Sequence, residues 1–144
     1  MIAHVWTVVC RQSVIDRDSN NVSLLNVLEQ ITLHGEAEAD ADERALVPIG
    51  MEVVTLWSRS DYDVPAGGVQ KLTLLSPSGE VLASGEQHTD LSKHRRFRNR
   101  ARFRGLPLAG PGRYVFRVEQ RETDDAEWHH VTDVPLEVLL ATER

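Results

Sequence analysis

Apolar and polar residues alternate with a period of two over several short stretches of the chain. The clearest alternation lies in residues 93–119, where two such runs flank a connection rich in glycine and proline. In an extended strand, successive side chains point to opposite faces of the sheet. The second run has Tyr114, Phe116 and Val118 on one face, and Arg113, Arg117 and Glu119 on the other. We therefore expect two half-buried strands joined by a turn, with the apolar face of the second strand in the core.

The first of these two runs carries an arginine at every second position. Five arginines share one face of the predicted strand, and we call them the arginine face: Arg96, Arg98, Arg100, Arg102 and Arg104. The opposite face carries Phe97, Ala101 and Phe103. Residues 93–104 contain one lysine, six arginines and no acid, although the net charge of the whole chain is -6. The rest of the chain therefore carries -13, and the arginine face is the most unusual feature of the sequence.

Further runs rich in β-branched and aromatic residues predict strands elsewhere. They cover residues 5–11, 22–33, 46–57, 69–75, 80–84 and 128–140. Residues 22–33 fit a helical stripe as well as a strand, but the Asn- and Asp-rich residues 16–21 predict a hairpin turn and so favour the strand. Two sets of side chains are each expected to share one strand face: His4, Trp6, Val8 and Cys10, and Leu25, Val27, Ile31 and Leu33.

Strand-like runs separated by turn signals recur along the whole sequence. Their number, about seven or eight, favours an all-β fold, and we predict an antiparallel β-sandwich of immunoglobulin-like character. A length of 144 residues with 41% hydrophobic residues fits one domain, spanning residues 1–144. The single cysteine, Cys10, excludes an intrachain disulfide, and the N-terminus does not have the pattern of a signal peptide. No apolar run reaches the ~18–20 residues of a membrane helix, so we expect a cytoplasmic protein.

Short stretches of the chain resemble known proteins. Residues 106–118, Leu-Pro-Leu-Ala-Gly-Pro-Gly-Arg-Tyr-Val-Phe-Arg-Val, look like the late strand of immunoglobulin-like and fibronectin-like sandwiches. This resemblance implies that Tyr114 packs at a corner and hydrogen-bonds the backbone upstream of it. Separately, residues 8–16, 20–31 and 72–79 resemble an uncharacterised family of small bacterial all-β proteins. In the present chain Arg11 stands where that family has an acid after the cysteine, and serines replace its turn acids. The resemblance implies an all-β fold and supplies no activity.

The arginine face has two interpretations. Arginines at every second position lie ~6.6–7 Å apart, close to the spacing of nucleic-acid phosphates. However, Phe97 and Phe103 are on the opposite face, so they could not stack bases beside the arginines as a single-strand binder requires. The alternative is a sheet face paired with carboxylates, which the negative net charge favours. Candidate acids with the same period of two, within the chain or across a dimer, are Glu36, Glu38, Asp40 and Asp42.

No motif points to catalysis or to a metal. His129 and His130 are adjacent, so in a strand their side chains face opposite ways and cannot bind the same metal ion. Cys10 and His4 are ~20 Å apart along a strand, which is too far for a metal site or a catalytic pair. The acidic residues do not form a calcium-binding loop. No Ser-His-Asp set, nucleophile elbow or glycine-rich phosphate loop stands out. We therefore predict a protein that is not an enzyme and that holds no cofactor or metal.

Two classes of function remain. The first is a non-catalytic binding or assembly module that acts through protein–protein contacts. The alternative is a nucleic-acid-binding protein that uses the arginine-rich strand 93–104, which the negative field of the whole chain disfavours. Because the edge strands of a sandwich invite pairing and twofold dimers are the commonest soluble oligomers, we also predict that the protein forms a homodimer. We further expect that it binds another protein, whose identity the sequence does not give, and that it does not associate with a membrane.

Overall fold

The computed structural model describes residues 1–34 and 46–141, and this part of the chain forms eleven β-strands and no helix. The strands are β1 (Ile2–Ile15), β2 (Val22–Val27), β3 (Gln30–Leu33), β4 (Leu46–Val47), β5 (Met51–Arg59), β6 (Ala66–Leu75), β7 (Val81–Leu91), β8 (Arg96–Phe103), β9 (Leu106–Pro107), β10 (Gly112–Arg121) and β11 (His129–Leu140). The all-β prediction is confirmed. There are more strands than predicted because the runs 22–33 and 46–57 are each divided in two, and because residues 106–107 form a short strand of their own.

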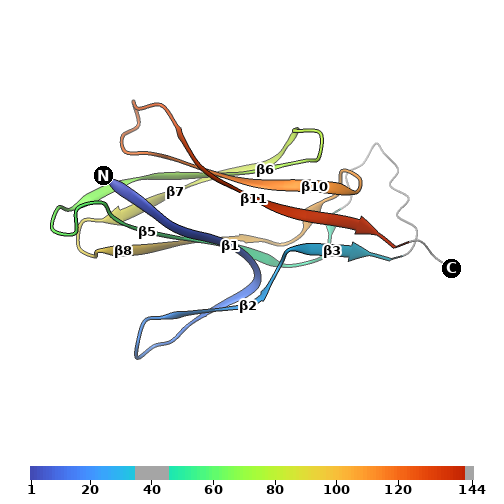
Figure 1. Ribbon diagram of the computed structural model, residues 1–144, viewed down its shortest axis with the longest axis horizontal. Helices are drawn as coiled ribbons and strands as arrows, with labels where there is room; N and C mark the ends of the chain where they lie inside the picture. The colour runs from blue at the N-terminus through green and yellow to red at the C-terminus, as the bar shows by residue number, and fades with distance from the viewer. Residues whose placement is uncertain (35–45, 142–144) are drawn as a thin grey trace.

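Two main sheets pack face to face as a sandwich (Figure 1). The four-stranded sheet has the order β2-β1-β5-β8, and the five-stranded sheet has the order β3-β11-β10-β6-β7. The short strands β4 and β9 pair separately. Among the described strands every pairing is antiparallel except that of β3 with β11, which is parallel. The predicted sandwich is confirmed, with this one parallel pair as the departure from a purely antiparallel arrangement.

The core contains the apolar face of β10, as the alternation predicts. Tyr114, Phe116 and Val118 are each 0% exposed. The hydroxyl of Tyr114 donates to the carbonyl of Gly110 at 2.6 Å and accepts from the N–H of Ala109 at 2.7 Å. These are the upstream backbone contacts that the resemblance of residues 106–118 implies, and they satisfy the polar end of a fully buried aromatic side chain.

The run 22–33 is extended rather than helical, but it does not present one face. Asn26 has a φ of 59°, in the left-handed region that Asn tolerates. The N–H of Leu28 then donates to the carbonyl of Val9 at 2.8 Å, after which β3 joins the five-stranded sheet beside β11. Val27 is consequently exposed whereas Ile31 is buried. The expectation that they share a face is wrong, because the chain changes sheet between them.

A bulge in β1 also corrects the expected face of the first strand. The pairing with β5 shifts between His4 and Trp6, so that His4 is opposite Trp57 whereas Trp6 is opposite Leu56. Residues directly opposite each other in a sheet share a face. His4 therefore lies on the core side, edge-on to the ring of Trp57 with their centroids 5.5 Å apart. Trp6 lies on the outer face, and a strict period of two could not separate these two residues.

Two features of the four-stranded sheet determine what borders β8 and its outer face. The edge of β8 is covered by β7, since Gln87 donates to the carbonyl of Arg100 and Asn99 donates to the carbonyl of His88. The end of the β1–β2 hairpin bends away from β10 and β6, as Figure 1 shows. The outer face of β5 and β8 is therefore bordered by the hairpin and by the loops at one end of the sheet.

Candidate anion-binding site

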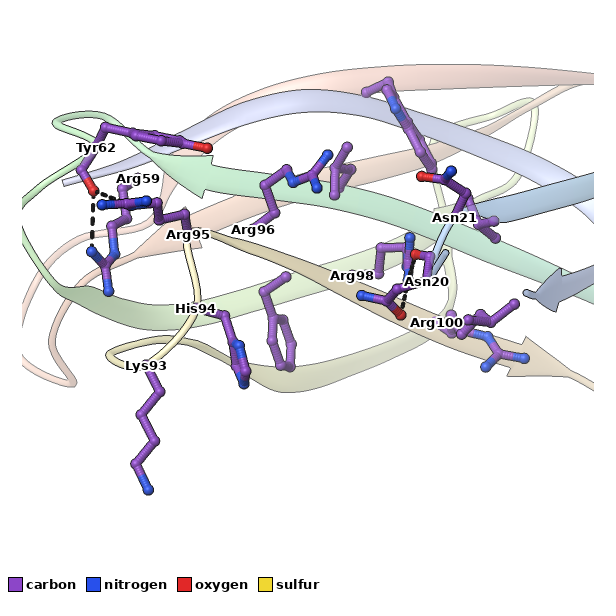
Figure 2. A pocket seen from close by; sticks show the side chains of 15 residues that line it. Asn20, Asn21, Arg59, Tyr62, Lys93, His94, Arg95, Arg96, Arg98 and Arg100 are labelled. Carbon is purple, nitrogen blue, oxygen red and sulfur yellow. Dashed lines mark hydrogen bonds between the residues drawn. The ribbon is translucent and has the colours of Figure 1, made fainter. Parts of the chain in front are cut away.

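The outer face of β5 and β8 forms the floor of a trough with a cavity volume of about 1060 Å³ (Figure 2). We call it the basic trough. Its lining residues come from the β1–β2 hairpin, from β5 with its following loop, and from the turn before β8 with β8 itself: Trp6, Ile15, Asn20, Asn21, Val22, Leu56, Arg59, Tyr62, Lys93, His94, Arg95, Arg96, Phe97, Arg98 and Arg100. Six of these carry a lysine or arginine charge and none is a carboxylate.

The structure brings three of the five predicted site residues into the basic trough: Arg96, Arg98 and Arg100. β8 pairs with β5 without a register shift from Arg96 opposite Ser58 to Phe103 opposite Met51, so the outward side of β8 is regular. Arg102 shares this side but is not part of the trough lining, and Arg104 lies beyond the end of β8. The strand prediction therefore placed the arginines correctly up to Arg102.

The register with β5 leaves most of these arginines beside neutral residues. Arg96, Arg98 and Arg100 are opposite Ser58, Leu56 and Val54, respectively. Cross-strand neighbours on one face are the side chains that normally compensate a charge. Here only Arg102 has an acid directly opposite, which is Glu52.

The carboxylate of Glu52 pairs with two residues of the arginine face. Its carboxylate lies 3.8 Å from Nε of Arg100 and 3.5 Å from Nε of Arg102, and it accepts a short hydrogen bond from the hydroxyl of Ser13. Nε of Arg100 also donates to Oγ of Ser13 at 3.0 Å. Glu52 is only 7% exposed, and a carboxylate so buried requires such partners. The predicted carboxylate pairing thus exists for two of the five arginines, whereas the proposed partners at residues 36–42 lie outside the described residues.

Arg98 is held by the tip of the β1–β2 hairpin. Its guanidinium donates to the backbone carbonyl of Asn20 at 2.8 Å and to the side-chain oxygen of Asn20 at 3.1 Å (Figure 2). Asn20 presents both oxygens from a left-handed conformation with a φ of 62°. Burial and the charges of Arg96 and Arg100 lower the pKa of Arg98, but arginine starts so high that it stays charged at neutral pH. The contacts with Asn20 orient this charge without cancelling it.

At the loop end of the trough two further guanidinium groups also donate hydrogen bonds to uncharged oxygens. Arg59 donates to the carbonyls of Leu91, Ser92 and Tyr62, at 2.9, 3.2 and 3.1 Å. Arg95 donates to the carbonyl of Tyr62 at 3.2 Å, and its guanidinium lies 4.4 Å from the centroid of the Tyr62 ring. Backbone carbonyls carry no net charge, so both guanidinium groups are positioned and remain cationic. Figure 2 shows the two groups converging on Tyr62.

Carboxylates contribute little at this end. Among the described residues the one acid in contact with Arg59 or Arg95 is Asp63, whose carboxylate lies 3.4 Å from Arg95 with both side chains more than half exposed. An exposed pair of this kind contributes at most about 1 kcal/mol. Within residues 1–34 and 46–141 no carboxylate pairs with Arg96 or Arg98.

Aromatic side chains reach the trough from outside β8. The alternation correctly assigns Phe97 and Phe103 to the other side of the strand, with Phe97 also bordering the cavity. Trp6 from β1 and Tyr62 from the loop after β5 lie on the same side as the arginines. The objection that no aromatic residue accompanies the arginines is therefore removed. The alternation does not reveal the bulge in β1 that places Trp6 on this face, and nothing in the local sequence places Tyr62 beside residues 95–98.

The side chains that line the trough are basic, aromatic or neutral. His94 is its one histidine, and no carboxylate or thiol lines the described cavity beside it. Cys10 is buried, and burial together with the charge of Glu52 raises the pKa of its thiol, which disfavours the nucleophilic thiolate. Among the described residues no group of three or more His, Cys, Asp or Glu side chains could hold a metal ion. His130 contacts Asp133 at 3.0 Å, on the other sheet.

Comparisons with known proteins give little further guidance. No family model matches the chain, and no curated protein matches it. A solved structure of a family 123 glycoside hydrolase from Clostridium perfringens is similar with a TM-score of 0.44 and 10% sequence identity, over 83% of this chain and 24% of that chain. A likeness of this size says nothing about activity, and this chain spans about a quarter of that protein. The described residues contain no helix that could cross a membrane.

Proposed function

We propose that the protein is a non-catalytic binding module that acts through protein–protein contacts, and that its basic trough holds an acidic segment of the partner. The observation that carries this proposal is the lining of the trough, with six lysine or arginine side chains and no carboxylate among the described residues. Guanidinium groups are suited to this partner because their planar donors bind carboxylates in a bidentate manner.

In the free protein the arginines of β8 repel one another, and a bound anion would reduce this repulsion. Arg96 and Arg98 project from the same side of β8 beside neutral cross-strand neighbours and pair with no described carboxylate, and like charges on one face repel one another. Asn20 and Tyr62 hold Arg98, Arg59 and Arg95 in place by hydrogen bonds to oxygens. Side chains that are already ordered lose less conformational entropy when a ligand binds. The site is therefore both charged and preorganised.

A second candidate ligand is single-stranded nucleic acid. Trp6 and Tyr62 lie on the same side as the arginines, and stacking of bases on aromatic rings beside a basic groove is how single strands are bound without sequence preference. The net charge of -6 opposes this candidate, because a long polyanion also meets the negative field of the rest of the chain. We therefore place the acidic protein segment first.

Binding measurements with two probes test the proposal. We expect a deca-glutamate peptide to bind the wild-type protein and to bind the Arg96→Ala variant several-fold more weakly. Arg113→Ala removes the same charge from the exposed side of β10, outside the trough, and is expected to leave the affinity unchanged. Absence of peptide binding, or an equal loss in both variants, would contradict the proposal.

Oligo(dT) of similar length separates the two candidates. If nucleic acid is the ligand, oligo(dT) will bind more tightly than the peptide, and Trp6→Leu will weaken the binding of oligo(dT) through the loss of stacking. If an acidic protein segment is the ligand, the peptide will bind more tightly and Trp6→Leu will have little effect. Both complexes are expected to weaken as salt is raised, so the comparison is made at one ionic strength.

Assembly as a homodimer, an immunoglobulin-like classification of the sandwich and a cytoplasmic location stay predictions. For the homodimer, β2 supports the proposal, because it is an edge strand of the four-stranded sheet and carries the exposed residues Leu25 and Val27. Light scattering at micromolar concentration is expected to give twice the monomer mass. A monomer mass throughout that range would contradict the prediction.

A further inference from the structure

We propose that the segment bound in the basic trough is extended and carries carboxylates at every second residue, in step with Arg96, Arg98 and Arg100 of β8. This inference rests on the proposed function and deepens it, because it specifies the conformation and the charge pattern of the acidic partner. The partner is a segment of another protein that runs along the face of β8.

The regularity of β8 supplies the spacing. Its pairing with β5 has no register shift, so the three arginines rise from the sheet in steps of ~6.6–7 Å. An extended segment with acids at every second residue repeats at the same distance and presents all of its carboxylates on one side. Each arginine then meets one carboxylate without bending either backbone.

A helical partner fits the trough less well. Acids at every fourth residue of a helix repeat at ~6 Å, so a helix needs about nine residues to reach three arginines. An extended segment of five residues reaches the same three arginines with about half as many residues.

The contact is made by side chains and not by strand addition. Gln87 and Asn99 connect β7 with β8, so the edge of β8 is not free for a further strand. Recognition therefore depends on the charges on the face of the strand. These charges are graded, because Glu52 lies within 4 Å of Arg100 and Arg102 whereas no described carboxylate pairs with Arg96 or Arg98. We expect the loss of affinity to be larger for Arg96→Ala and Arg98→Ala than for Arg102→Ala.

Three capped peptides of nine residues test the charge pattern. Each contains three glutamates in an otherwise neutral background, placed at every second residue, at every fourth residue or consecutively. Equal length and charge remove differences that arise from non-specific attraction. We expect the first peptide to bind about fivefold more tightly than the other two, because an extended chain of either of those can place only two glutamates opposite the three arginines, and one additional pair at the upper end of the usual range amounts to that ratio. Arg96→Ala is expected to abolish most of this preference and Arg113→Ala to leave it intact.

A charge swap tests the register. Arg96→Glu should reject the alternating peptide, and a peptide with lysine in place of one terminal glutamate should recover part of the lost affinity. Circular dichroism of each variant confirms folding, and Arg96 is suited to substitution because its side chain is exposed. Recovery would support an extended ligand in register with β8. Failure of every lysine-containing peptide to recover affinity would overturn that register.

The remaining outcomes separate this inference from the proposed function. Equal binding of the three peptides, with sensitivity to Arg96→Ala, would overturn the extended pattern and leave the basic trough as an acidic-segment site. Binding of oligo(dT) alone would overturn both in favour of nucleic acid. If the peptides bind only after Glu36, Glu38, Asp40 and Asp42 are changed to Gln, the assignment to a separate protein is overturned, because acids of this chain then compete for the trough.

Discussion

The outward sides of β8 and β10 look alike in sequence and differ in how their charges are compensated. On β10, Arg113 is opposite Glu137 and Arg117 is opposite Asp133, and the Arg117 guanidinium lies 3.1 Å from the Asp133 carboxylate. On β8, the register with β5 puts Ser58, Leu56 and Val54 beside three arginines. Both strands follow the same period of two. The neighbouring strand decides whether the charges of β8 or of β10 remain uncompensated. Because β5 leaves arginines of β8 without acids opposite them, the basic trough is the candidate site.

The inward sides of the two strands, where they resemble each other, carry the largest expected effect. Tyr114→Ala is expected to lower the free energy of unfolding by about 3–5 kcal/mol, since it truncates a fully buried aromatic residue. Tyr114→Phe keeps the ring and removes the hydroxyl that contacts Ala109 and Gly110, so its effect should be about 1–3 kcal/mol. Chemical denaturation measures both. A Tyr114→Ala variant as stable as the wild type would contradict the assigned core.

Removing the carboxylate that compensates one end of β8 sharpens the comparison. Glu52→Gln leaves Ser13, Arg100 and Arg102 without their charged partner and is expected to lower the free energy of unfolding by about 1–3 kcal/mol. The same substitution extends the uncompensated run of arginines, so the affinity for an acidic peptide should rise. Denaturation and calorimetric titration of one variant give both results. A fall in affinity would show that Glu52 positions the arginines more than it neutralises them.

Opposite signs are expected when one charge is removed from each strand pair. Asp133→Asn removes the partner of Arg117 and is expected to destabilise the fold by about 0.2–1 kcal/mol. Arg96→Gln relieves repulsion with its neighbouring arginines, so it is expected either to leave the stability of the fold unchanged or to raise it by at most about 0.5 kcal/mol. Thermal denaturation at low salt compares the two variants with the wild type. A destabilised Arg96→Gln variant would indicate that Arg96 is already compensated.

The smallest expected effect is the pH dependence of the β10–β11 pair. Burial raises the pKa of Asp133, but hydrogen bonds from Arg117 and His130 outweigh it, so the pKa lies below the ordinary value of 3.8. The folded state therefore binds fewer protons, and the stability from Asp133 is present above pH 3.8 and lost as the pH falls through the lowered pKa. The difference in stability between the wild type and Asp133→Asn should shrink over that range. A difference that grows in acid would contradict the assigned pairing.

The alternation within each strand is a local property, and the sequence predicted it well. It assigned the core side of β10, the outward side of β8 and the all-β class. The errors lie where the chain departs from a regular strand: the bulge that separates His4 from Trp6, and the change of sheet between Val27 and Ile31. Neither has a marker that a period of two can detect.

Cross-strand register was also beyond the sequence. The neutral row of β5 beside Arg96–Arg100 depends on pairing between residues more than thirty positions apart, as does the approach of Arg59 and Tyr62 to Arg95. These long-range contacts convert a charged strand into a trough. The acids at residues 36–42 matched the arginines in period, but the acid that contacts them in the described structure is Glu52. A match in period identifies candidates and leaves the partner open.

The most direct test of the central claim is a map of amide chemical-shift changes on titration with the alternating acidic peptide. If the basic trough is the binding site, the changes will concentrate on β8 from Arg96 to Arg100, on Asn20 at the hairpin tip and on Tyr62, and they will fade as salt is raised. The outward side of β10 and β11, where Arg117 is paired with Asp133 and Arg113 is opposite Glu137, will be unaffected. Changes centred on Arg113 and Arg117, or no changes at millimolar peptide, would contradict the claim.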